Sequence, residues 1–256
     1  MERDVESGEG GKPKPGPAAA ATAVPVPVGP PPYPVMLENP ELRWAFIRKV
    51  YTILSIQLVL SVAVGCVVVF VGPISHFFLS TSAGLALYIV LIFVPFITIC
   101  PLYYYHKKHP LNFIFLFIFT VTIAFAVGLT CAFTNGRVLL ESVILTAAVV
   151  LVLTLYTFWA SKRGHDFKFL EPFLFIAMLI LFIFAMIQLF VPLGRISHII
   201  YGVLASIIFS GYIIYDTDNL IKRYSYDQYI WASVALYLDI INLFLSLLTL
   251  CSATRR

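Results

Sequence analysis

Residues 230–251 read IWASVALYLDIINLFLSLLTLC, and this stretch decides the fold class. It is long enough to cross a bilayer as a helix, which takes about 20 mostly apolar residues. One charged side chain, Asp239, lies well inside it. A carboxylate within hydrocarbon costs roughly 2.5–3.5 kcal/mol even on mild insertion scales, so such a residue indicates function by default. The stretch therefore predicts a transmembrane helix that carries a functional acid.

The rest of the chain repeats this apolar pattern. The sequence is 60% hydrophobic and only 12% charged, whereas soluble domains carry about 25% charged residues. Seven apolar segments are expected, at approximately 50–71, 84–105, 111–133, 139–160, 170–191, 198–220 and 230–251. The separators are short, so neighbouring helices should be antiparallel. The predicted fold is all-α, a polytopic membrane bundle of seven transmembrane helices.

The beginning of the chain differs in composition. Residues 1–37 are rich in Pro and Ala and predict a disordered cytosolic tail. Residues 38–256 form the predicted membrane domain. Its first part, 38–50, places apolar residues at helical spacing among Arg and Lys, which favours a short amphipathic helix at the membrane surface. The tail shows no cleavable signal peptide, so the first span should act as an uncleaved signal anchor.

Lys and Arg fall unevenly on the two sides of the predicted bundle. One side carries Arg43, Arg48, Lys49, Lys107, Lys108, Lys162, Arg163, Lys168, Lys222 and Arg223, and the other has Arg137, Arg195, Arg255 and Arg256. The positive-inside rule then places the N-terminus in the cytosol. Seven full spans put the C-terminus outside or in the lumen. A re-entrant last stretch would return it to the cytosol, where Arg255 and Arg256 fit better.

Several classes of function are disfavoured. The net charge of +4 is small and no long basic run is present, which argues against a nucleic-acid partner. The four cysteines show neither CxxC nor Cys/His spacing, and the five histidines form no HExxH motif. No GxSxG or paired Ser and His is evident either. We expect no enzyme activity and no cofactor.

A second acid, Asp216, ends the preceding apolar segment. It lies about six residues, or ~9 Å, inside the boundary at Lys222. Asp239 lies about nine residues, or ~14 Å, inside the boundary near residue 230. The two carboxyl groups should therefore lie at comparable depths on adjacent antiparallel helices. Contact between them is expected if both face the centre of the bundle.

Two neighbouring carboxylates in a low dielectric resist ionisation together, because desolvation and like-charge repulsion both favour the neutral form. Their protons then belong to the pair rather than to either residue. Such a pair can share a proton as a latch between helices, or lose it and bind a hard cation such as Ca²⁺ transiently. In the structural alternative, each Asp caps a group or pairs with a basic residue.

Three more polar residues are secondary candidates. Asp218 precedes Lys222 by four positions, and a local ion pair explains it. Asn242 lies three residues beyond Asp239 on the same helical face, where it could hold that carboxylate by a hydrogen bond. Glu141 stands near the non-cytosolic start of the fourth segment. It either pairs with Arg137 or attracts cations at the outer mouth of a pathway.

Three stretches together resemble the Bax inhibitor / Lifeguard family of transmembrane Bax-inhibitor-motif proteins, most closely its plant Lifeguard members. They are Arg43–Tyr51, Gly211–Leu220 and Leu236–Phe244. The resemblance covers residue 38 to the C-terminus. It implies a seven-helix bundle, residence in the endoplasmic reticulum, Golgi or another endomembrane, suppression of programmed cell death, and a pH-sensitive Ca²⁺ leak.

In bacterial members of that family a pair of aspartates on the last two helices forms the proton-sensitive latch, and the matching positions here are Asp216 and Asp239. Bacterial members also carry a basic residue on the second helix, and residues 84–105 contain none.

The leading hypothesis is an endomembrane, pH-sensitive Ca²⁺ leak channel or Ca²⁺/H⁺ exchanger that suppresses cell death. Asp216 and Asp239 would be its sensor, and its partners are the lipid bilayer, Ca²⁺ and protons. The alternative is a membrane interaction protein that binds cell-death regulators without transporting ions. A seven-helix receptor is disfavoured because the charge bias puts the N-terminus inside.

Overall fold

The computed structural model describes residues 40–105, 108–191 and 193–255. The chain divides into two units, Met1–Pro32 and Tyr33–Arg256. The predicted tail at 1–37 lies outside the described residues.

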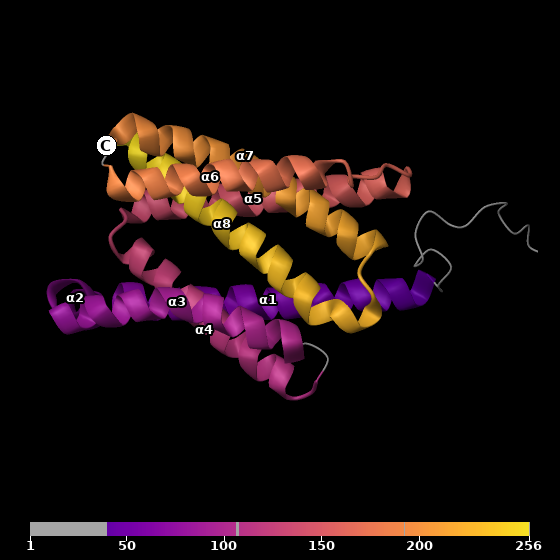
Figure 1. Cartoon of the computed structure of the whole chain (residues 1–256), viewed down its shortest axis with the longest axis horizontal. Coiled ribbons are helices and arrows are strands. Elements are labelled where there is room, and N and C mark those ends of the chain that lie inside the picture. Colours follow the sequence, from indigo (N-terminus) through magenta and orange to yellow (C-terminus); the bar gives the residue numbers. More distant parts are fainter. Residues whose placement is uncertain (1–39, 106–107, 192, 256) are drawn as a thin grey trace, which may run out of the picture. The chain divides into compact units, whose positions relative to one another are not determined.

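Helices make up the second unit, and no strand occurs among the residues that the structure describes. In chain order they are α1 (Pro40–Phe70), α2 (Gly72–Ser80), α3 (Ser82–Tyr105), α4 (Leu111–Ala132), α5 (Gly136–Lys162), α6 (Leu170–Phe190), α7 (Arg195–Lys222), the short 3-10 helix η2 (Tyr226–Gln228) and α8 (Tyr229–Arg255) (Figure 1).

Seven of the described helices are long and apolar enough to cross a membrane, which confirms the predicted all-α, seven-span class. The helix expected at 38–50 is continuous with the first span, since α1 extends unbroken over Pro40–Phe70. The sequence did not predict α2, which begins at Gly72-Pro73 where a loop was expected. Proline is favoured in the first turn of a helix. The chain does turn at Gly72-Pro73, but the short helix that begins there was not predicted.

Helix α8 lies at the centre of the packing. Of the 18-residue apolar stretch of α8, 61% is buried, compared with 11% for α6 and 6% for α3. Tyr237 of α8 is fully buried, and its hydroxyl lies 2.8 Å from Ser61 Oγ of α1. Such contacts satisfy polar side chains inside an otherwise apolar bundle.

The two ends of α8 are distinct places in the fold. We call the "basic end" of the bundle the region of Lys222, Arg223 and the α5–α6 loop at 163–169. The "opposite end" is where α8 finishes at Arg255. There Arg195, which begins α7, donates from Nε to Ala253 O (2.7 Å) and from Nη2 to Thr254 O (2.7 Å). The last segment is thus a continuous helix from one end to the other, as seven full spans require.

Candidate functional site

Helices α7 and α8 pack closely, and this contact places the two acids. Small residues allow the approach: a Cβ added to Gly202 of α7 would lie 2.9 Å from Leu250 Cβ and 3.0 Å from Leu250 N of α8. Ser206 of α7 donates to Ser246 Oγ of α8 at 3.2 Å. Small and hydroxyl residues at a helix interface let the backbones come near each other within a membrane.

The carboxyl groups of Asp216 and Asp239 lie within hydrogen-bonding reach of each other. Asp239 is buried, with 6% of its surface exposed, and Asp216 is partly exposed. Within the described part of the chain, Asp239 Oδ2 has no hydrogen-bond partner. Asn219 Nδ2, one turn along α7, donates to Asp216 Oδ1 at 3.4 Å. We call Asp216 and Asp239 the carboxyl pair.

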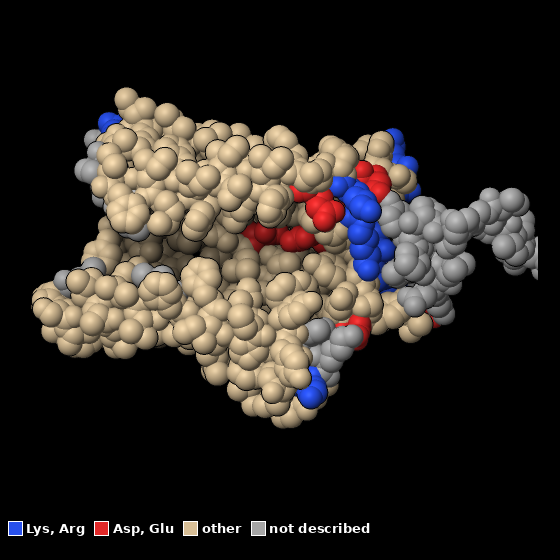
Figure 2. Space-filling model, viewed as in Figure 1, with Lys and Arg blue, Asp and Glu red and all other residues tan. Residues whose placement is uncertain are grey.

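Acidic side chains gather in a hollow of the molecular surface. Figure 2 shows them in the floor of a depression between the α6 and α3 sides of this face, with Lys and Arg at one end. Tyrosines complete the surroundings, since Tyr212 of α7 and Tyr224, just after α7, both interact electrostatically with the two carboxyl groups. The Tyr212 hydroxyl donates to Leu174 O of α6 at 3.1 Å.

Asp218 belongs to a different arrangement. Its Oδ1 lies 2.6 Å from Lys222 Nζ, which is the local ion pair that the spacing predicts. Its Oδ2 accepts from the backbone N–H of Phe167 at 3.3 Å and lies 3.7 Å from Arg223 Nη2. Asp218 therefore binds the α5–α6 loop to α7, on the side of the helix away from Asp239.

Two predicted contacts are wrong. Asn242 donates from Nδ2 to Leu238 O of its own helix at 2.8 Å, and not to the Asp239 carboxylate. Its amide prefers the carbonyl one turn back, which is always within reach on a helix.

Glu141 pairs with Arg255 at the opposite end, and not with Arg137. The end of α8 brings Arg255 next to α5, a contact that sequence spacing could not indicate.

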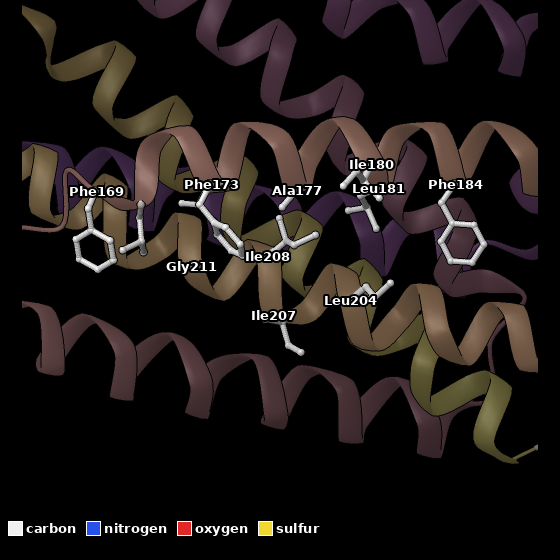
Figure 3. A pocket seen from close by; sticks show the side chains of 12 residues that line it. Phe169, Phe173, Ala177, Ile180, Leu181, Phe184, Leu204, Ile207, Ile208 and Gly211 are labelled. Carbon is white, nitrogen blue, oxygen red and sulfur yellow. The ribbon is translucent and has the colours of Figure 1, made fainter.

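Other parts of the described chain offer less chemistry. Nowhere among the described residues, the carboxyl pair included, do three or more His, Cys, Asp and Glu lie together so that they could bind a metal ion. A groove of about 660 Å³ lies between α6 and α7, from Phe169 to Phe184, and apolar side chains such as Phe173 and Ile208 line it (Figure 3). This groove provides no ligand for an ion.

Sequence reasoning missed three polar residues near the carboxyl pair: Asn219, Tyr224 and Arg223. Arg223 donates to the Asn219 side-chain oxygen and also pairs with Asp166 of the α5–α6 loop. Helical spacing offered one signal, because Asn219 follows Asp216 by three positions and precedes Arg223 by four.

Comparisons with known proteins agree on one family. The family described as "Inhibitor of apoptosis-promoting Bax1" matches residues 43–256. The chain is 69% identical to Protein LIFEGUARD 4 of Arabidopsis thaliana, covering 86% of this chain and 90% of the relative. It is 33% identical to Bax inhibitor 1 of Schizosaccharomyces pombe, covering 81% and 76% of the two chains. It is 35% identical to the Golgi anti-apoptotic protein of vaccinia virus, covering 84% and 88%.

Proposed function

Because this chain belongs to the Bax inhibitor family, in its Lifeguard branch, we propose that it is an endomembrane, pH-sensitive Ca²⁺ leak channel or Ca²⁺/H⁺ exchanger that suppresses programmed cell death. The names of two relatives, Bax inhibitor 1 and Golgi anti-apoptotic protein, support the role in cell death and the endomembrane location. None of the relatives named above is called an enzyme, and the proposed role is not enzymatic.

The contact between Asp216 and Asp239 is the observation that carries the transport proposal. Two carboxyl groups in contact within an apolar bundle are stable when they share a proton. The shared proton then holds α7 to α8. When pH rises and the proton leaves, two like charges face each other in a low dielectric, and the helices separate.

The ionised pair is suited to attract Ca²⁺. This cation takes six to eight oxygen ligands, and two carboxylates supply at most four of them. The remaining ligands would be water and oxygen atoms of neighbouring groups. Such an incomplete set favours passage of the ion over its retention.

The proposed orientation places the basic end in the cytosol, following the positive-inside rule. The carboxyl pair would then control access from the cytosolic side. Glu141 remains a weaker candidate at the outer mouth. It is 46% exposed and its ion pair with Arg255 is at the surface, so water screens its charge.

Ca²⁺ flux from proteoliposomes across a pH series tests the proposal. We expect flux from the wild type to rise with pH as the shared proton leaves. Asp216→Asn and Asp239→Asn should each flatten this response, because an amide cannot share or lose that proton. Asp227→Asn is the matched control, since it removes an exposed carboxylate outside the bundle. It should behave as the wild type.

Unchanged flux and pH response in both carboxyl-pair variants would refute the site. If the wild type moves no Ca²⁺ at any pH yet still protects cells from death, the protein acts by binding regulators instead. Deletion of residues 1–37 then tests that alternative, and loss of protection would implicate the tail.

A further inference from the structure

Four charged residues join the α5–α6 loop to the end of α7. Lys222 pairs with Asp218 at 2.6 Å and also donates to His165 O of the loop. Arg223 pairs with Asp166 of the loop and approaches Asp218 Oδ2 at 3.7 Å. We call Asp166, Asp218, Lys222 and Arg223 the clamp. It contains two cations and two carboxylates, so its charges balance.

Burial makes the ion pairs of the clamp costly to separate. The Asp218 side chain is fully buried and the Lys222 side chain is 5% exposed. Removal of one partner from a buried ion pair leaves an uncompensated charge and strongly destabilises the arrangement. The backbone N–H of Phe167 also donates to Asp218, which fixes the loop by its main chain. The loop therefore cannot leave α7 without separating these charges.

The clamp also extends toward the carboxyl pair. Arg223 Nη1 donates to Asn219 Oδ1, and Asn219 Nδ2 donates to Asp216 Oδ1 at 3.4 Å. The guanidinium fixes the orientation of this amide, because it can only donate and so requires the amide oxygen on its side. The amide nitrogen is thereby directed at the carboxylate. Asn219 is 8% exposed, so little water competes for these bonds.

We propose that Asn219 and Arg223 are positioning residues that couple the α5–α6 loop to the carboxyl pair, so that attachment of the loop sets how readily the pair loses its proton. Any effect of this coupling on Ca²⁺ flux rests on the proposed function. The coupling itself rests on the contacts of Asn219 with Arg223 and Asp216. A fixed cation one amide away favours the ionised form of Asp216. Arg223 thus provides, from the end of α7, the positive charge that the second helix lacks.

Among the described residues, the other groups that interact with the two carboxyl groups are phenols and an amide. Tyr212 and Tyr224 face both carboxyl groups, and Tyr51 of α1 approaches Thr217. Phenols carry no charge near neutral pH. Glu171 of α6 approaches Tyr215 and is acidic. Arg43 of α1 donates to Ile221 O (2.8 Å) and Tyr224 O (2.5 Å), so its guanidinium is directed at the end of α7.

Two variants separate attachment of the loop from the relay, by which we mean the contacts from Arg223 through Asn219 to Asp216. Arg223→Gln removes the cation from both. Asn219→Leu removes only the relay and leaves every ion pair of the clamp in place. Arg163→Gln is the matched control, because Arg163 is an arginine of the same loop that stacks on Trp159 at 4.2 Å. It therefore changes the net charge equally without altering the contacts of Asn219.

Attachment of the loop is measured by hydrogen exchange of residues 163–168 in the full chain. We expect exchange to accelerate at least tenfold in Arg223→Gln and to stay at the wild-type rate in Asn219→Leu and Arg163→Gln. Proton loss from the pair is measured by infrared titration of its carboxyl C=O band, assigned with Asp239→Asn. The titration midpoint should rise by roughly half a pH unit to one unit in Arg223→Gln and in Asn219→Leu.

An unchanged loop in Arg223→Gln would overturn the clamp. A wild-type midpoint in both Arg223→Gln and Asn219→Leu would overturn the coupling. Neither hydrogen exchange nor infrared titration depends on Ca²⁺ flux. A wild type that moves no Ca²⁺ would refute the proposed function, while these two measurements would still test the coupling.

Discussion

Two buried aspartates of α7 and α8 differ in what neutralises them. Asp218 is fully buried beside Lys222, whereas buried Asp239 lies against the carboxyl group of Asp216. In an ion pair, a buried charge is compensated by an opposite charge. In a pair of buried acids, one negative charge is avoided because a proton is retained. The same residue type therefore lies against a cation in one place and against a second acid in the other. Only the neighbour decides between the two.

At the residue scale, Gly202→Ala is expected to lower stability. The added Cβ would lie 2.9–3.1 Å from Leu250, and two of the three nearest atoms belong to its backbone, which cannot move aside. Overpacking of this kind costs about 1–3 kcal/mol. Thermal unfolding in detergent measures it. Gly65→Ala is the control, because a Cβ there meets nothing within 4 Å. Equal melting temperatures for the two variants would show that the α7–α8 approach is less close than described.

Helix α8 contacts α7 both within its first half and at its end. Asp239 lies against Asp216 of α7 ten residues after the start of α8, and at the end of α8 Arg195 donates to the carbonyl groups of Ala253 and Thr254. The last carbonyl groups of a helix lack partners within the helix, and a cation there also interacts favourably with the helix dipole. The final turn of α8 is thus completed by another element.

At the scale of this element, Arg195→Ala should fray the end of α8. We expect faster hydrogen exchange over residues 250–255 and a loss of about 1 kcal/mol of stability. Arg137→Ala removes an exposed arginine from the same end and serves as the control. If exchange over this turn is the same in both variants, Arg195 does not complete the helix.

The α5–α6 loop gives a pH-dependent prediction. Burial raises the pKa of Asp166, but the Lys168 amide and the charges of Arg223 and Lys222 outweigh it, and the pKa lies below its ordinary value. A depressed pKa means that the stabilisation is present above the ordinary value, about 3.9, and is lost as pH falls through the lowered one.

The wild type should therefore melt roughly 1–2 °C above Asp166→Asn from pH 8 to 5, since partly exposed ion pairs contribute little. This difference in melting temperature should disappear below about pH 4. Melting curves of both proteins over this pH series measure it. A gap that closes between pH 7 and 5 would contradict the lowered pKa, and would mean that the loop titrates together with the carboxyl pair.

At the scale of the whole molecule, the seven spans separate the start of α1 from the end of α8. Helix α1 begins at Pro40 on the side of the basic end, and α8 reaches the opposite end at Arg255. The clamp and the carboxyl pair are close to one end, whereas Glu141 and Arg195 are at the other. A molecule with this arrangement can respond differently to the solutions on its two sides.

Protease protection in sealed microsomes tests this arrangement. A tag before residue 1 should be digested from the cytosolic side, and a tag after residue 256 should be protected. A tag inserted at Gly164, in the exposed α5–α6 loop, is the control and should be digested. Digestion of all three tags would place both termini in the cytosol and contradict seven full spans.

Much of this protein follows from the sequence alone. The spans, the ion pair of Asp218 with Lys222, and the presence of acids at two similar depths all come from hydropathy or from spacing within one helix. These properties are local, because a side chain three or four positions away on a helix is always a neighbour. A long apolar run likewise predicts a span whatever surrounds it.

The tertiary structure decided the rest. It paired Glu141 with Arg255, turned Asn242 back onto Leu238 and joined Asp166 to Arg223. These contacts depend on how each helix is rotated about its axis and on which helices are adjacent, and a local pattern contains neither. The sequence by itself therefore determined that two acids lie within the membrane, and only the packing of α7 on α8 decided that they meet.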